Sequence, residues 1–432
     1  MPTKQPHHTE AADRGGDRLI DALVGAARRW GVLIGGPATA AVAAALGTLL
    51  ATVILLRLLP GAEAGHFVLI LAVLQTLGMV ANLGQNNVLT RRYSVQPLGA
   101  HDWPRDLGAS LIIAAPVILA GTLVAARLYD LPTAYWVFLL VALILRVPLH
   151  AMAYMLTAKR HYTWGNLLLR LPNSLLILPA LVLLFIPELA TLNPVLLWLL
   201  VSLVLVNLLG LALLVHHFPR GTLTITLRQR ADGLILLAST GTQNLPNNGL
   251  VALAGAILLP AQLATFAAMA VLMRPFRLLS NILVMILTPE LIRQYRPSYT
   301  RMLIGILGLA ALAGVFTAIV GPPLASWVYA GRYDDGITLI PILVLAGSLR
   351  LAGSLPRSYL LGRARTSTLN RYVVVMAIAV LVALLLGILL TDRLGIVGLA
   401  VGITLIELAN ASLNYLFLRV AHRQEPLQQS AS

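Results

Sequence analysis

The chain has 432 residues, of which 58% are hydrophobic and only 11% carry a charge, and its mean hydropathy is +0.85. This composition excludes an ordinary soluble protein and indicates an all-α polytopic membrane protein. The net charge of +15 does not indicate a nucleic-acid partner, because the basic residues are spread over successive loops. The sequence has no cysteine, which excludes disulfides, thiol catalysis and cysteine-type metal sites.

Twelve apolar segments are each long enough for a transmembrane helix, which needs roughly 20 residues. Before them, residues 1–30 are predicted to form a cytoplasmic segment with an amphipathic helix over 17–30, and no cleavable signal peptide is visible. The predicted spans, in chain order, are 31–57, 67–89, 107–128, 134–156, 166–187, 192–216, 233–259, 261–289, 302–330, 336–361, 372–391 and 395–419.

The positions of Lys and Arg predict the orientation in the membrane. With the N-terminus inside, the inside segments hold 21 of the 31 Lys and Arg residues. The outside segments hold four: Arg57, Arg127, Arg332 and Arg393. We therefore predict that both termini are cytoplasmic and that the inside loops contact anionic phospholipids.

The chain divides into two predicted lobes of six spans. The N-lobe covers 31–216, a cytoplasmic linker covers 217–232, the C-lobe covers 233–419 and a cytoplasmic tail covers 420–432. Leu-Leu-Pro precedes span 2 at 58–60 and enters span 8 at 258–260. In spans 4 and 10, an Arg is followed about two turns later by a Tyr. Such parallel repeats predict a substrate site between the lobes near the middle of the membrane.

Six arginines lie inside the predicted spans, where each central guanidinium costs roughly 2.5–3.5 kcal/mol to insert. Only Glu407, of the 16 Asp and Glu residues, lies equally deep. The arginines therefore predict a water-filled cavity that receives an anionic ligand such as a diphosphate. They are Arg146, Arg170, Arg274, Arg277, Arg350 and Arg357. The alternative is structural: guanidiniums that bond carbonyls freed by Pro148, Pro172, Pro275 and Pro356.

Other polar groups in the spans allow two interpretations each. Four amides surround Pro246 and form either a kinked gate that binds sugar hydroxyls or ordinary interhelical bonds: Gln243, Asn244, Asn247 and Asn248. The 82–87 segment, NLGQNN, favours a polar cap at the inside end of span 2. Glu407 is either a protonatable coupling site or the counter-ion of one Arg, and His150 is either a titrating partner of Arg146 or a packed histidine.

Three segments carry a resemblance to a known family: 57–92 around the first outside loop, 278–295 at the end of span 8, and 392–419 around the last span. They resemble the O-antigen (Wzx-type) polysaccharide-biosynthesis flippases of the multidrug/oligosaccharidyl-lipid/polysaccharide (MOP) exporter superfamily. The resemblance implies alternating access that moves an undecaprenyl-diphosphate-linked oligosaccharide across the bacterial inner membrane. It also implies a cationic central cavity for the diphosphate and sugars, a role that suits the interior arginines.

Further expectations follow from this resemblance. We expect no cofactor, no covalent chemistry, a monomer, and polysaccharide polymerase and glycosyltransferases as further partners. One alternative is a cation or drug antiporter of the same fold, whose transport would depend on Glu407 rather than on the arginines. Another is a lipid II flippase, whose branch usually adds two helices beyond the twelve predicted here. A membrane glycosyltransferase or ligase is disfavoured by the short predicted outside loops.

Overall fold

The computed structural model describes residues 42–97, 99–226, 248–292, 299–363 and 366–424, together with Thr39 and Arg230. Within these ranges the chain is helical apart from turns and one isolated β-bridge between His101 and Leu223. Nine helices in the described part are long and apolar enough to cross a membrane, and the shorter apolar helix Val42–Leu58 precedes them. The predicted all-α polytopic architecture is confirmed.

The first half of the described chain begins with Val42–Leu58 and continues through seven α-helices. Prolines precede two of these helices, Pro60 before α2 and Pro132 before α5, where the fixed φ of proline favours a chain turn into a helix. The helices are α2 Gly61–Ala81, α3 Gln85–Val95, α4 Trp103–Leu128, α5 Thr133–Ala158, α6 Tyr162–Ser174, α7 Ile177–Phe185 and α8 Leu192–His217, with a short 3₁₀ turn, η1 Pro187–Leu189, before α8.

The second half includes α15 Thr366–Gln424, which contains a sharp turn at Gly395, where φ is 59° and ψ is −135°. That backbone conformation suits glycine, and it separates α15 into the two helices predicted over 372–391 and 395–419. The preceding elements are α10 Pro260–Ala270, η2 Val271–Met273, α11 Arg274–Ile292, α12 Tyr299–Tyr329, η3 Asp334–Leu339, α13 Ile340–Ala352 and α14 Ser354–Arg363.

Several predicted spans are broken helices. Span 2 ends as α2 at Ala81, and α3 begins only after a turn in which Leu83 and Gly84 have positive φ angles of 43° and 71°. Spans 5, 8 and 10 are interrupted between α6 and α7, at η2, and between α13 and α14. Apolar composition predicts that a span is present but does not indicate where its helix breaks. The sequence therefore did not predict these interruptions. Most of span 7, predicted over 233–259, lies outside the described residues.

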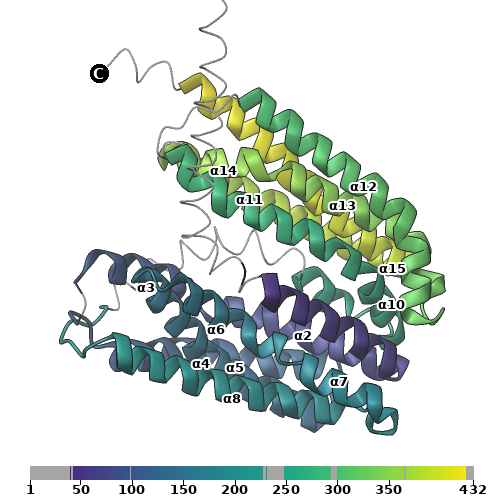
Figure 1. Cartoon of the computed structure of the whole chain (residues 1–432), viewed down its shortest axis with the longest axis horizontal. Coiled ribbons are helices and arrows are strands. Elements are labelled where there is room, and N and C mark those ends of the chain that lie inside the picture. The colour runs from purple at the N-terminus through teal and green to yellow at the C-terminus, as the bar shows by residue number, and fades with distance from the viewer. Residues whose placement is uncertain are drawn as a thin grey trace, which may run out of the picture.

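Figure 1 shows the helices gathered in two bundles. We call Val42–Leu58 and α2–α8 the N-terminal bundle, and α11–α15 the C-terminal bundle. Helix α10 packs along α2 and also contacts α13, so it lies between the two. The exact lobe boundaries stay predictions, because residues 231–247 lie outside the described ranges.

The two halves of the chain pack closely where the Leu-Leu-Pro repeats begin α2 and α10. A Cβ atom built on Gly65 would lie 1.8 Å from the carbonyl oxygen of Pro260, so only glycine permits this approach of α10. One turn earlier, a Cβ on Gly61 would lie 3.9 Å from the Cβ of Ala261. The two sequence repeats therefore pack against each other across the interface.

Hydrogen bonds close the same end of the molecule, which is the predicted outside end. The Tyr333 hydroxyl donates to the carbonyl of Leu56 at 2.7 Å, and Nη1 of Arg332 donates to the carbonyl of Arg57 at 2.9 Å. Nearby, the Tyr129 hydroxyl donates to the carbonyl of Ala252 at 2.7 Å. These bonds join loops and helix ends of the two halves.

The predicted linker, 217–232, is bound to the N-terminal bundle at the opposite end through Arg230. Arg230 is buried there, and its Nη2 lies 2.7 Å from Oδ1 of the buried Asp106. Its Nη1 donates to Gln85 Oε1 at 3.1 Å, and the Tyr93 hydroxyl donates to the other Asp106 oxygen at 3.0 Å. Burial and the adjacent Asp106 carboxylate raise the pKa of Tyr93, which keeps this donor protonated.

We predict that a Gly61→Cys, Ala261→Cys pair forms a disulfide on mild oxidation. The Cβ separation matches the usual range of about 3.5–4.5 Å, and the natural chain has no competing cysteine. Formation is checked by the mobility shift of the purified protein with and without reductant.

Adding Gly65→Leu to this pair slows cross-linking by about 5–100-fold, since overpacking costs about 1–3 kcal/mol. Gly108→Leu is the matched control, because a side chain there meets nothing within 4 Å. Equal cross-linking in the Gly65→Leu and Gly108→Leu backgrounds contradicts the proposed contact of α2 with α10.

Candidate functional site

A central cavity of about 450 Å³ lies between the N-terminal bundle and the first helices of the second half. Val42–Leu58, α2 and α6 line it on one side, and residues 248–251, α10 and α11 line it on the other. Its volume falls within the range of about 300–1,000 Å³ that is usual for ligand pockets. The polar lining consists of Thr48, Thr52, Gln75, Arg170, Asn173, Asn248, Arg274 and Arg277.

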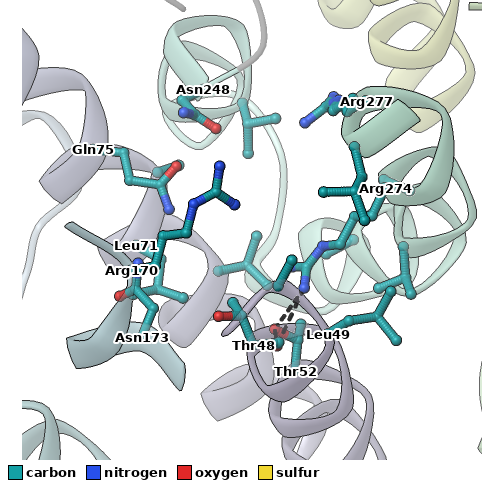
Figure 2. A pocket seen from close by; sticks show the side chains of 18 of the residues that line it. Thr48, Leu49, Thr52, Leu71, Gln75, Arg170, Asn173, Asn248, Arg274 and Arg277 are labelled. Carbon is teal, nitrogen blue, oxygen red and sulfur yellow. Dashed lines mark hydrogen bonds between the residues drawn. The ribbon is translucent and has the colours of Figure 1, made fainter. Parts of the chain in front are cut away.

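Three of the six predicted arginines line this central cavity. Figure 2 shows the guanidinium of Arg170 entering it from α6 and that of Arg277 from α11, on opposite sides. Helix α11 begins at Arg274 directly after the 3₁₀ turn η2. Because Arg274 and Arg277 are three residues apart, they share one helix face. The N-terminal and C-terminal bundles thus each contribute arginine side chains to the central cavity.

Arg274 also connects the two halves. Its Nη1 donates to the Thr52 hydroxyl at 2.9 Å and to the Thr48 carbonyl at 3.3 Å, as the dashed lines in Figure 2 show. The Thr52 hydroxyl in turn donates to the Thr48 carbonyl at 2.7 Å. Arg274 therefore bonds a carbonyl, as the structural alternative expects, but that carbonyl belongs to a helix of the other half.

No carboxylate is among the described residues that line the central cavity. Its titratable side chains are the three arginines, and the other polar lining groups are amides and hydroxyls. Pro275 follows Arg274 and also lines the cavity. The lining therefore has a net positive charge, which favours an anion over a cation.

Arg350 and Arg357 lie elsewhere, in a small pocket within the C-terminal bundle that also includes Glu407. Nη1 of Arg350 is 2.9 Å from Oε1 of Glu407, and the two side chains are only 14% and 2% exposed. This is the geometry expected if Glu407 is the counter-ion of one Arg. A coupling role for Glu407 stays a prediction.

Arg146 and His150 pack inside the N-terminal bundle, behind Leu169 and Asn173 of the cavity wall. Nε of Arg146 donates to Nε2 of His150 at 3.3 Å, so that ring nitrogen carries no proton. The other ring nitrogen, Nδ1, lies 3.1 Å from Nδ2 of the Asn82 amide. This arrangement is that of a packed histidine, and a coupling role for His150 stays a prediction.

Only one of the four amide side chains predicted around Pro246 lies among the described residues. Asn248 lines the central cavity, whereas Gln243, Asn244 and Asn247 lie outside the described residues. At the other predicted polar segment, Asn82 contacts His150 and Gln85 contacts Arg230, so both groups serve local packing.

The sequence interpretation missed Thr48, Thr52, Gln75 and Asn173 in the cavity lining. A usable signal existed for Asn173, which is three residues after Arg170 and therefore on its helical face. Thr48 and Thr52 are one turn apart, but threonines are common in membrane helices and gave no distinct signal.

No protein-family model and no curated protein matches the sequence. Solved structures nevertheless share its fold. Lipid II flippase MurJ, in an inward closed conformation, is 12% identical over 88% of this chain and 86% of that chain, with a TM-score of 0.65. An inward-facing multidrug resistance MATE family transporter is 14% identical over 90% of this chain and 96% of that one, with a TM-score of 0.61.

A third similar structure is a MOP superfamily transporter from Pyrococcus furiosus described as having a binding pocket of reverse polarity. It is 14% identical over 91% of this chain and 98% of that chain, with a TM-score of 0.56. Together these structures show that the chain has the fold of the MOP superfamily, a multi-pass membrane fold. The more specific resemblance to O-antigen flippases stays a prediction.

We predict that Glu407→Gln lowers the free energy of unfolding by about 3–5 kcal/mol, because it leaves the largely buried Arg350 without its charged partner. The measurement is the thermal unfolding of the purified protein in detergent. Asp392→Asn, which removes an exposed carboxylate, serves as the control and leaves the unfolding temperature unchanged. Replacing both partners by Arg350→Met and Glu407→Leu restores most of the loss. A Glu407→Gln protein as stable as the natural one shows that the ion pair is not formed.

Proposed function

We propose that this protein is a transporter that flips a lipid-diphosphate-linked oligosaccharide across the bacterial inner membrane, with both termini in the cytoplasm. The observation that carries the proposal is the central cavity, lined by three guanidiniums and by no described carboxylate. A diphosphate supplies the missing negative charge, and Arg forks match the geometry of phosphate oxygens.

Both bundles contribute to the proposed binding. Arg170 comes from the N-terminal bundle and Arg277 from α11, so a headgroup bound between them contacts both sides. Gln75, Asn173 and Asn248 supply neutral donors and acceptors of the kind that bind sugar hydroxyls. The apolar wall includes Phe67 and Phe266. Charge thus selects the diphosphate, and the amides contact the glycan.

The contacts that close the predicted outside end indicate the conformation in which the proposed transport cycle starts. The Gly65–Pro260 contact and the Tyr333–Leu56 bond join the halves at the predicted outside end. With the predicted orientation, this conformation receives its substrate from the cytoplasmic side. Release on the other side requires these contacts and the bond from Arg274 to Thr52 to break. A bound anion favours that change only if it binds the opened state more strongly.

The alternative is a cation or drug antiporter, because multidrug transporters share the fold. It is less well supported, since Glu407, the deep carboxylate that such a role would use, is paired with Arg350 at 2.9 Å. The Pyrococcus furiosus transporter is instructive here, because its reversed pocket polarity is said to suggest a different function. Pocket charge, rather than fold, is therefore the better guide to the substrate.

A lipid II flippase is the second alternative, because MurJ, which is named for that activity, shares the fold. The cavity chemistry suits both substrates, while the twelve predicted spans favour the O-antigen or exopolysaccharide branch. On this proposal the protein is not an enzyme, and its further partners are anionic phospholipids, a polysaccharide polymerase and glycosyltransferases.

We predict that Arg170→Gln and Arg277→Gln each weaken binding of undecaprenyl diphosphate by about 10–100-fold. Each variant removes a charge-assisted hydrogen-bond donor pair, at about 1.5–3 kcal/mol. Binding is measured to the natural protein and its variants in nanodiscs. Arg393→Gln, at an exposed position, is the control and binds as the natural protein does.

The opposite pattern contradicts the proposal. It consists of undecaprenyl diphosphate binding that is indifferent to Arg170 and Arg277, together with uptake of tetraphenylphosphonium that is lost in Glu407→Gln. That result establishes the cation antiporter.

A further inference from the structure

One face of the helix Val42–Leu58 is bonded to the second half of the chain. Thr48, Thr52 and Leu56 follow one another at intervals of one turn, so they lie on that face. Nη1 of Arg274 donates to the Thr52 hydroxyl at 2.9 Å and to the Thr48 carbonyl at 3.3 Å (Figure 2). Leu56 is bonded to the second half at the predicted outside end. The bonds therefore form a row that runs from the central cavity to that end.

The bonds of this row differ in what can reach them. Thr48, Thr52 and Arg274 line the central cavity. The Leu56 carbonyl accepts from the Tyr333 hydroxyl at 2.7 Å, and both residues are buried and are not among the described residues that line the cavity. A ligand in the cavity can therefore compete for Arg274, whereas the bond at the outside end lies beyond its reach.

Both acceptors of Arg274 are neutral groups. The Thr52 hydroxyl and the Thr48 carbonyl accept hydrogen bonds from the guanidinium but do not balance its charge. A phosphate oxygen adds Coulomb attraction to the hydrogen bond, and two such oxygens match the fork of an Arg side chain. A phosphate group is therefore the stronger partner for Arg274 and replaces the threonine groups.

A neighbouring side of the same helix is held by its own bundle. The Ser174 hydroxyl, at the end of α6, donates to the Ala44 carbonyl at 2.7 Å and lies 3.3 Å from the Thr48 hydroxyl. A Cβ atom built on Gly47 would lie 3.5 Å from the Cβ of Ser174, an ordinary packing distance. The same α6 carries Arg170. The helix thus connects the two elements, α6 and α11, whose arginines enter the central cavity.

We propose that Thr52 is a positioning residue that holds the Arg274 guanidinium in the ligand-free protein and releases it to a bound anion. This inference rests on the proposed function and adds how binding in the central cavity is transmitted to the outside end. When a phosphate takes the guanidinium, one interaction that holds the helix Val42–Leu58 to the second half breaks before that end opens. The anion thereby favours the opened state, because it binds more strongly where Arg274 is already released.

The first test is the affinity of Thr52→Val for undecaprenyl diphosphate in nanodiscs. Valine removes the hydroxyl with little change of shape. It destabilises the ligand-free protein, in which Arg274 uses this acceptor, but not the bound one, so we expect binding about 2–10-fold tighter than in the natural protein. Thr52→Ser keeps the hydroxyl and binds as the natural protein does.

Thr90→Val is the matched control, because the Thr90 hydroxyl donates to the Asn86 carbonyl of its own helix, at 2.9 Å. It leaves the affinity unchanged. Weaker binding by Thr52→Val shows that Thr52 contacts the ligand itself, and unchanged binding shows that no bond is exchanged. Either result overturns the proposal.

The second test needs no ligand. Ala264 is buried on α10, one turn after Pro260 and on the same face. In a chain with no other cysteine, Ala264→Cys reacts with a maleimide in proportion to the population that is open at the outside end. Thr52→Val raises this labelling rate by about 2–10-fold, and Thr90→Val does not.

A double-mutant cycle connects the effect to Arg274. Arg274→Gln raises the labelling rate as Thr52→Val does, and the two together raise it no further than either alone, because both remove the same bond. A labelling rate unaffected by Thr52→Val, or effects that add in the double variant, overturns the proposal.

The two tests separate this inference from the proposed function. A natural protein that does not bind undecaprenyl diphosphate contradicts the proposed function, and the labelling rates still decide whether Thr52 and Arg274 control the outside end. Normal binding with no effect of Thr52→Val in either test contradicts the role of Thr52 alone.

Discussion

The excess of guanidinium over carboxylate in the apolar interior is the constraint on which the rest of the structure depends. Six arginines lie within the predicted spans, and Glu407 is the one acidic residue equally deep in the sequence. The fold distributes the arginines to three places. Three line the central cavity, Arg350 and Arg357 share a pocket with Glu407, and Arg146 donates a hydrogen bond to His150. The positive charge of the arginines is balanced differently in each of these three places. Of the three, the central cavity is the one with the volume for a large ligand.

Arg274 links this charge to the shape of the molecule. It lines the central cavity, and it also bonds Thr48 and Thr52 of the first described helix across the interface. Beyond this point, Gly65 and Pro260 bring α2 and α10 into close contact at the predicted outside end. In the proposed cycle, a ligand that competes for the Arg274 guanidinium weakens a bond that keeps this end closed. Substrate binding and opening of the outside end then both depend on the Arg274 side chain.

Much of the fold was predictable because membrane helices are marked by long apolar runs, and the turn at Gly395 was marked by a short polar interruption. The breaks before Arg274 and at Gly84 were not, because these spans are apolar on both sides of the break and no residue pattern marks where the helix is interrupted. The site was predictable as an excess of arginine, since charge in lipid is costly wherever it points. Its division into separate pockets depends on the packing of distant helices, such as the pairing of Arg350 with Glu407, which no local pattern encodes.

The most direct measurement of the central claim is a structure of the protein bound to an undecaprenyl-diphosphate-linked oligosaccharide. The account predicts diphosphate density in the central cavity, within hydrogen-bond distance of Arg170 and Arg277, with the sugars toward the amides of Gln75, Asn173 and Asn248. Density for the headgroup outside this cavity, with both guanidiniums bonded only to protein carbonyls or carboxylates, would contradict it.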